Sequence, residues 1–232
     1  MSSNGGSTSL ASSLTDLMTS LAVIFILLLT ASLNNFHQRN LKTVTSVKIE
    51  LQRVLEEFRL KGVEVRSDEK DPLVLLVIIP EDLLNFKYAN ATIRPEGLEF
   101  LQRFAPRLVK TVCAEDIRDS VASIVVEGHA DARGSPRGNL DWSQQRASSV
   151  VLETLGILGG QPEEEREAYT SCFKRVVSAA GRGDADPVKD PNGIPDPDKS
   201  RRVIFKIRIR QAGLELTDHV PGITKSEFHS DG

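Results

Sequence analysis

A nearly uninterrupted apolar segment close to the N-terminus constrains this chain more than any other feature. Residues 14–33 contain one charged side chain, Asp16, and their centre reads A-V-I-F-I-L-L-L. A helix of about 20 residues crosses the hydrocarbon core of a bilayer at a rise of about 1.5 Å per residue. The alternative is a cleaved signal peptide, but the preceding residues contain no Lys or Arg and the apolar run is long for such a peptide. We therefore predict a retained transmembrane helix over residues 14–33.

The segments on either side of this span differ in composition. Residues 1–13 are rich in Ser, Gly and Asn, which predicts a flexible tail. In residues 34–71 apolar side chains recur at helical spacing from Leu41 to Phe58, with charged residues between them. This pattern predicts an amphipathic linker helix that ends near Gly62 and forms a dimer coil or a plug.

The remaining residues predict one α/β domain over residues 72–212 and a polar tail over 213–232. Strand patterns cover 73–79, 120–127, 173–179 and 203–210, and helical patterns cover 95–112, 141–158 and 163–169. The order β-α-β-α-β-β predicts an α/β sandwich with a mixed sheet. The net charge is −3 and aromatic residues make up only 5% of the chain, so neither a basic surface nor a base-stacking platform for nucleic acid is expected.

One motif in this domain combines an acid with an arginine fifteen residues further on. The motif runs G-H-A-D at 128–131 and continues through Asn139, Trp142 and Ser143 to Arg146. A carboxylate at the end of a strand and a guanidinium in the following helix can bind the two ends of one small zwitterion. Arginine suits this role because its planar fork binds a carboxylate through two hydrogen bonds.

These residues resemble the signature of the OmpA/MotB/Pal peptidoglycan-binding family, G-H-T-D followed by N-x-x-L-S-x-x-R-A. Ala130 and Trp142 replace the usual threonine and leucine. Two further matches are F-K-Y-A-N-A-T-I-R-P-E-G at 86–97 and S-R-R-V at 200–203, so the resemblance covers about residues 72–210. It implies that peptidoglycan is bound through its diaminopimelate, with the roles carried by Asp131, Asn139, Trp142 and Arg146.

Asp16 has two interpretations. It can cap the helix at the membrane interface together with its Ser and Thr neighbours. Alternatively, L-T-D-L-M-T at 14–19 resembles the start of the MotB span, in which the acid carries the ion of a membrane motor. That resemblance implies that Asp16 carries a proton or sodium ion, with Thr19 and Ser20 along the path. It also implies a homodimer inside a ring of MotA-like or ZorA-like membrane subunits.

The sequence of the N-terminal region distinguishes between three kinds of MotB-like chain. It lacks the basic tail and aromatic lead of flagellar stator subunits and is closer to the ZorB family of Zorya anti-phage systems. A flagellar stator and a passive Pal-like wall tether are the alternatives. The resemblance implies an inner-membrane protein with a cytoplasmic N-terminus and a periplasmic domain. The positive-inside rule opposes this orientation, because Arg39, Lys42 and Lys48 follow the span.

The two cysteines and an acidic loop leave alternatives open. Cys113 and Cys172 are either a disulfide, reasonable in an oxidising periplasm, or two buried thiols. The loop over residues 184–198 is either a solvated Pro/Asp connection or a calcium site. The candidate calcium ligands in this loop are Asp184, Asp186, Asp190, Asn192, Asp196 and Asp198.

Catalysis is not expected from this chain. Ser143 and His129 could suggest a hydrolase, but Ser143 belongs to the binding motif and no G-x-S-x-G sequence occurs. The two cysteines lack the spacing of metal ligands. No cofactor is therefore expected apart from the transported ion and the calcium of the acidic loop.

Overall fold

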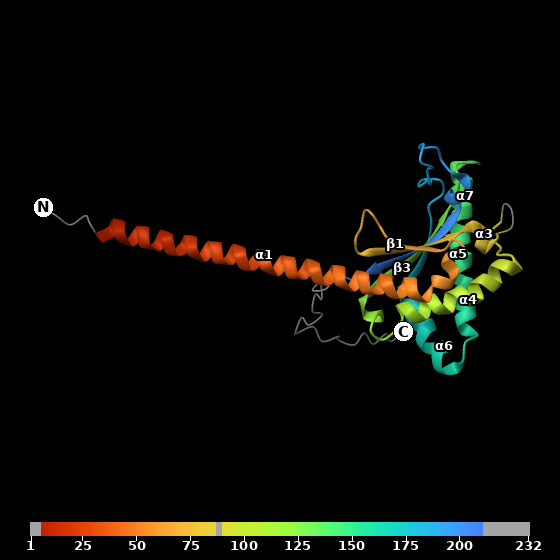
Figure 1. Ribbon diagram of the computed structural model, residues 1–232, viewed down its shortest axis with the longest axis horizontal. Helices are drawn as coiled ribbons and strands as arrows, with labels where there is room; N and C mark the ends of the chain where they lie inside the picture. Colours follow the sequence, from red (N-terminus) through yellow and green to blue (C-terminus); the bar gives the residue numbers. More distant parts are fainter. Residues whose placement is uncertain (1–5, 87–89, 211–232) are drawn as a thin grey trace, which may run out of the picture. The chain divides into compact units, whose positions relative to one another are not determined.

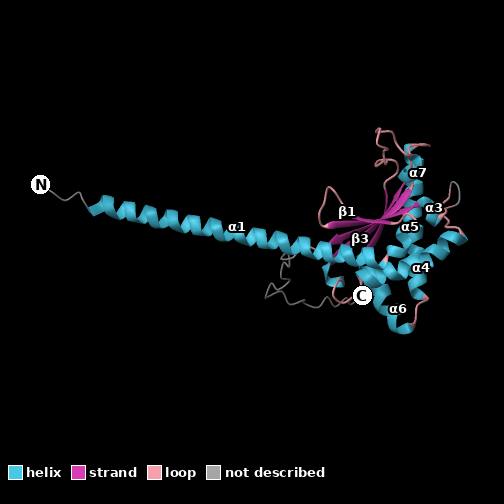
Figure 2. Cartoon of the chain, viewed as in Figure 1, coloured by secondary structure: helices cyan, strands magenta, loops and turns pink. Residues whose placement is uncertain are grey.

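The structure is a computed structural model that describes residues 6–86 and 90–210. These residues divide into two units, one ending at Phe36 and one running from His37 to Arg210. Helix α1 (Gly6–Val54) contributes its N-terminal part to the first unit and its C-terminal part to the second. The second unit also contains all the strands, gathered in one sheet, and the remaining helices (Figure 2).

The first unit has the length and composition of a membrane-spanning helix. Leu14–Asn35 has a mean hydropathy of 2.1, and all of its side chains are exposed. An apolar surface of this extent is unfavourable in water and favourable in lipid. The helix includes the predicted span 14–33 but begins at Gly6, so residues 6–13 are helical rather than a flexible tail. Extending an existing helix avoids the cost of nucleation. Residues 1–5 of that tail lie outside the described residues.

The predicted linker helix over residues 34–71 is wrong in its second half. Helix α1 ends at Val54 and is followed by the short helix α2 (Glu56–Arg59) and the strand β1 (Glu64–Ser67). Gly62 separates helix from strand, as expected, with a φ of 99° that favours glycine. A strand of only four residues is too short to show an alternating pattern in the sequence.

The apolar stripe of that segment packs inside the chain's own domain. The side chains involved are all buried and belong to the main core: Val44, Val47, Leu51, Leu55 and Phe58. They are therefore not available for the dimer coil or plug that the stripe predicted. The folded unit begins at His37 rather than at residue 72, because these side chains complete its core.

Five strands form one mixed sheet in the order β1-β2-β5-β3-β4. Two of them, β1 and β3, are labelled in Figure 1. Strands β3 and β4 are parallel, whereas the other neighbouring pairs are antiparallel. The α/β class and the mixed sheet are therefore as predicted, with β1 as an additional strand. The remaining strands are β2 (Val74–Pro80), β3 (Val121–His129), β4 (Val177–Gly181) and β5 (Arg202–Ile209).

Three longer helices pack beside the sheet and follow the predicted pattern closely. Helix α4 (Pro95–Val112) has the predicted bounds, and α5 (Pro136–Gly159) begins five residues early because Ser135 caps it. Helix α6 (Glu163–Val176) includes Phe173, which the sequence assigned to a strand. The short helices are α3 (Glu81–Leu84), η1 (Arg118–Ser120) and α7 (Pro197–Ser200).

Helix α5 lies unusually close to the sheet because two glycines face it. A Cβ on Gly128 of β3 would lie 2.1 Å from the carbonyl oxygen of Ser143, and one on Gly181 of β4 would lie 2.8 Å from that of Leu140. Both distances are too short for any larger side chain. The glycine of the G-H-A-D motif therefore sets the distance between α5 and the strand that precedes Asp131.

A disulfide joins Cys113, at the end of α4, to Cys172 of α6, with their Cα atoms 6.1 Å apart. The bridge, one of the two alternatives for these cysteines, is therefore the one that the structure contains. It links two helices that otherwise make few contacts with each other.

Replacing both cysteines by serine should destabilise the domain by about 2–4 kcal/mol, because the bridge closes a loop of 59 residues and restricts the unfolded chain. Urea unfolding of the full chain in detergent measures the change. Adding a reductant should lower the stability of the native chain by a similar amount and leave the double-serine variant unchanged. Equal stability of the two proteins without reductant would contradict this account.

Candidate functional site

The candidate site lies where three strands reach the same edge of the sheet. The register pairs Arg202 of β5 with both His129 of β3 and Pro80 of β2. Glu81, Arg201 and Asp131 lie just beyond these three positions in the chain. Strand β5 lies between β2 and β3, so residues distant in sequence meet at this edge.

Asp131 is buried and bound by two arginines. Its Oδ2 accepts hydrogen bonds from Arg133 Nε at 3.0 Å and from Arg201 Nη1 at 2.6 Å, and its Oδ1 accepts one from the Arg133 backbone N–H at 2.9 Å. Burial raises the pKa of this carboxyl, but the hydrogen bonds from the two arginines outweigh burial and lower the pKa to about 2. Asp131 is therefore a stable anion at neutral pH.

Asn139 supports the loop that carries this acid. It is buried in the first turns of α5, and its Nδ2 donates to the backbone oxygen of Asp131 at 3.1 Å. The loop between Asp131 and α5 also contains Gly134, whose φ of 95° favours glycine. Asn139, which the sequence assigned to the binding motif, thus contacts the backbone of Asp131.

Arg146 lies at the same edge of the sheet, two helical turns after Asn139 on α5. Its guanidinium lies 5.1 Å from the centre of the Phe86 ring, and its Nε donates to the backbone oxygen of Asn90 at 3.4 Å. Trp142 precedes it by one helical turn and is partly exposed. Residues four apart share a helix face. Trp142 is therefore placed to contact a ligand that binds Arg146.

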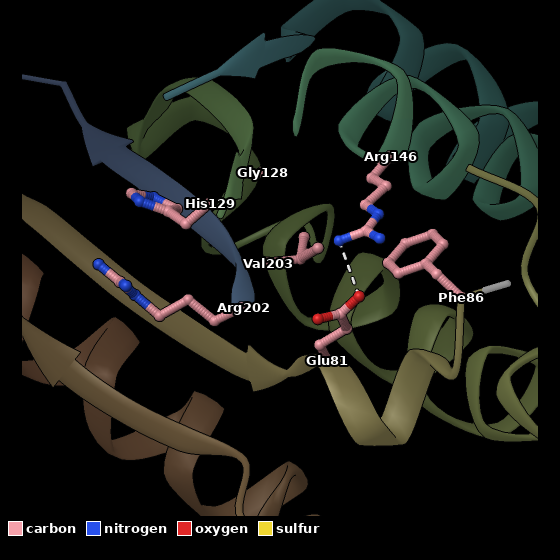
Figure 3. A pocket seen from close by; sticks show the side chains of 7 residues that line it. All are labelled: Glu81, Phe86, Gly128, His129, Arg146, Arg202 and Val203. Atoms are coloured by element: carbon pink, nitrogen blue, oxygen red, sulfur yellow. Dashed lines mark ion pairs between the residues drawn. The ribbon is translucent and has the colours of Figure 1, made fainter. Parts of the chain in front are cut away.

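The acid and the arginine of the motif do not pair with each other but are connected through two further residues. Arg146 Nη1 lies 2.7 Å from Glu81 Oε1, as Figure 3 shows, and Glu81 Oε2 lies 2.7 Å from Arg201 Nε. Arg201 in turn binds Asp131. A continuous chain of alternating charges therefore runs from Asp131 to Arg146.

Sequence reasoning did not assign a role to Glu81 or Arg201. Arg201 belongs to the S-R-R-V match before the last strand, which was the available signal. Glu81 follows directly after β2, and its role depends on the strand order, which no local pattern reports.

The hollow beside this charge chain is narrow and contains no space as large as a water molecule. It is lined by residues of α3 and the segment after it, of β3, of α5 and of β5 (Figure 3). The lining residues are Glu81, Phe86, Gly128, His129, Arg146, Arg202 and Val203. Glu81 therefore occupies Nη1 of Arg146 beside this hollow.

Two residues that could suggest a hydrolase have structural positions. Ser143 is buried, donates to the Leu140 oxygen at 2.8 Å and accepts from the Gly183 N–H at 2.9 Å, so it joins α5 to the segment after β4. His129 is buried and points away from Arg146 in Figure 3. Burial lowers the pKa of His129, and Glu127, 3.5 Å away, opposes this effect. The two side chains do not meet as a nucleophile and its base.

The acidic loop does not gather its carboxylates around one point. Asp190 Oδ1 accepts backbone hydrogen bonds from Asn192 at 2.9 Å and Ile194 at 2.8 Å, and Asp196 caps α7. Asp186 pairs with an arginine, as does Asp198. Within residues 6–86 and 90–210, no group of three or more His, Cys, Asp and Glu side chains is placed to hold a metal. The loop connects β4 to α7, and calcium binding by it stays a prediction.

The candidate ion site lies in the first unit. Asp16 is exposed near the start of the span, and Ser20 shares its helix face. Thr19 is exposed and donates to the Thr15 oxygen at 2.8 Å. The two hydroxyls lie one turn from the carboxyl, as the sequence spacing predicts.

Comparison with known proteins finds relatives described as Zorya protein ZorB. No family model matches the chain. It is 23% identical over 218 residues to the Zorya protein ZorB of Escherichia coli strain Crooks, covering 88% of this chain and 89% of that protein. It is 26% identical over 149 residues to ZorB of Escherichia coli O139:H28, covering 60% of this chain and 58% of that protein.

The fold has a counterpart among solved structures. A putative MotB-like protein from Desulfovibrio vulgaris superposes with a TM-score of 0.50 at 18% identity, covering 75% of this chain and 98% of that one. The globular part therefore has a MotB/OmpA-like fold.

Asp131 should make the stability of the domain depend on pH in acid. Its pKa is lowered from about 3.9 in the unfolded chain to about 2, so it stabilises the fold above pH 4 and loses this effect as the pH falls towards 2. The shift corresponds to at most about 2.6 kcal/mol. Urea unfolding of the native chain and of Asp131→Asn should differ most above pH 4 and converge near pH 2. A difference that stays constant over this range would contradict the assignment.

Proposed function

We propose that this chain is the peptidoglycan-anchored, ion-conducting subunit of a MotA/MotB-like membrane motor, of the ZorB type found in Zorya anti-phage systems. The observation that carries the proposal is the combination, in one chain, of a span with an acid near its start and a MotB/OmpA-like domain with Asp131 and Arg146 at one edge. The similarity to two ZorB proteins favours the Zorya type over a flagellar stator.

The domain would hold the cell wall through its diaminopimelate. The ammonium of this zwitterion would pair with the Asp131 carboxylate, whose lowered pKa keeps it charged. The carboxylate would take the guanidinium of Arg146, which Phe86 and Asn90 already orient. Asn139 would keep Asp131 in place, and Trp142 would contact the peptide beside them.

The disulfide supports a periplasmic position for the domain. Disulfides form and persist in oxidising compartments, and Cys113 and Cys172 are bridged. The positive charges after the span favour the opposite orientation, but they are few and the positive-inside rule is a bias. We therefore place the N-terminus in the cytoplasm of the inner membrane.

Asp16 would carry the ion past a ring of MotA-like or ZorA-like subunits that surrounds two copies of this chain. Each charge that crosses the membrane provides about 2.3 kcal/mol per 100 mV. A sodium ion bound by Asp16, Thr19 and Ser20 would be driven in the same way. This proposal assigns no catalysis to the chain.

Replacing Arg146 by Ala should abolish sedimentation of the full chain with purified peptidoglycan, because the carboxylate of the ligand loses its partner. Arg175→Ala is the matched control, since it removes one positive charge from an exposed position on α6. Both variants should unfold as single cooperative units. Undiminished sedimentation of Arg146→Ala would rule out the zwitterion site.

Replacing Asp16 by Asn should abolish phage protection in cells that carry the neighbouring genes, because an amide cannot take up and release a proton at this position. Asp16→Glu retains a carboxyl and should keep part of the protection. Immunoblots of membrane fractions establish equal expression. Loss of swimming alone would indicate a flagellar stator, whereas full protection with Asp16→Asn would reduce the chain to a wall tether.

A further inference from the structure

Glu81 occupies the position at Arg146 that a ligand carboxylate would need. Its Oε1 lies 2.7 Å from Arg146 Nη1, and the two side chains are only 18% and 15% exposed. The other oxygen, Oε2, forms an ion pair with Arg201 Nε at 2.7 Å but accepts no hydrogen bond from any described residue. The hollow has no room for a water molecule while these pairs are in place.

The backbone around Glu81 is held in place from several sides. The Glu81 N–H donates to the Arg201 oxygen at 3.2 Å, and the Glu81 oxygen accepts from Asn85 at 2.7 Å. Helix α3 also lies against α4 so closely that a Cβ on Gly97 would lie 2.0 Å from the Leu84 oxygen. Release of Arg146 therefore requires rotation of the Glu81 side chain rather than movement of α3.

Arg146 keeps two other contacts when Glu81 leaves it. The Phe86 ring supports the guanidinium at 5.1 Å, and the Asn90 oxygen accepts from its Nε at 3.4 Å. These contacts leave the outer nitrogens of the fork directed towards the hollow. The arginine is thus oriented for a carboxylate, whether that of Glu81 or that of a ligand.

We propose that Glu81 is an internal competitor that makes the site selective for zwitterions over simple carboxylates. A ligand with only a carboxylate replaces the Glu81 carboxylate at Arg146 and leaves Glu81 without its ion pair to Arg146. A zwitterion also brings an ammonium, which pairs with the displaced Glu81 and with Asp131. This inference rests on the proposed binding of diaminopimelate and extends it to the basis of selectivity.

The test compares two ligands that differ only in their amines. Meso-diaminopimelate and pimelate share the seven-carbon diacid chain, and pimelate lacks both ammonium groups. Isothermal titration of the full chain in detergent measures both dissociation constants for the native chain, Glu81→Gln and Asp82→Asn. Asp82→Asn is the matched control, because Asp82 is an exposed acid on the same helix and its loss changes the net charge equally.

Glu81→Gln should bind pimelate at least about fivefold more tightly than the native chain, and its preference for diaminopimelate should decrease. The gain should disappear in the double variant Glu81→Gln, Arg146→Ala. Asp82→Asn should match the native chain. If Glu81→Gln does not fold, Glu81→Ala takes its place with the same expectation.

The outcomes separate this inference from the proposed function. If the native chain binds diaminopimelate but Glu81→Gln gains no affinity for pimelate, the competitor role is wrong and the wall-binding role stands. If the native chain does not bind diaminopimelate but Glu81→Gln gains pimelate binding through Arg146, the proposed function is wrong and Glu81 is still a competitor. If the native chain does not bind diaminopimelate and Glu81→Gln gains no affinity for pimelate, both the proposed function and the competitor role are wrong.

Discussion

The candidate site depends on two of the three ion pairs that Arg201 makes with the described residues. This side chain lies 2.6 Å from Asp131 and 2.7 Å from Glu81, so it joins the loop after β3 to the helix after β2. Without it the carboxylates of Glu81 and Asp131 would lie at one edge of the sheet with no cation between them. Like charges in a partly buried position repel each other strongly. Arg201 thus makes it possible for two acids and the fork of Arg146 to share one small region.

Close packing gives this charged region its fixed geometry. The glycines on β3 and β4 allow α5 to lie directly on the sheet, and Ser143 and Gln144 of α5 bind the backbone after and within β4. Asn139 and Arg146 are therefore carried by a helix that cannot slide along the sheet. Preorganised side chains of this kind lose little freedom when a ligand binds. The apolar segment Leu14–Asn35 is not packed in this way, since all of its side chains are exposed. They need lipid or partner chains to cover them.

Much of the fold could be predicted because the relevant patterns are local. The bounds of α4 follow from its helical spacing and from Pro95 in its first turn, and the span follows from its length and hydropathy. Two predictions were wrong because they concern segments whose structure depends on tertiary contacts. The stripe from Val44 to Phe58 is amphipathic in either a dimer coil or a domain core, and the sequence does not say which surface covers it. Phe173 suits a strand or a buried helix equally well.

The apolar segment 14–33, the α/β class and the G-H-A-D motif could be predicted from the sequence, because each depends on a period, a length or a short run of residue types. Only the tertiary structure decided that Asp131 and Arg146 are joined through Arg201 and Glu81. Asp131 and Arg201 are 70 positions apart, and their contact exists because β5 inserts between β2 and β3. Strand order is a property of the whole packed chain, since it depends on which faces are buried together, and no local pattern contains it.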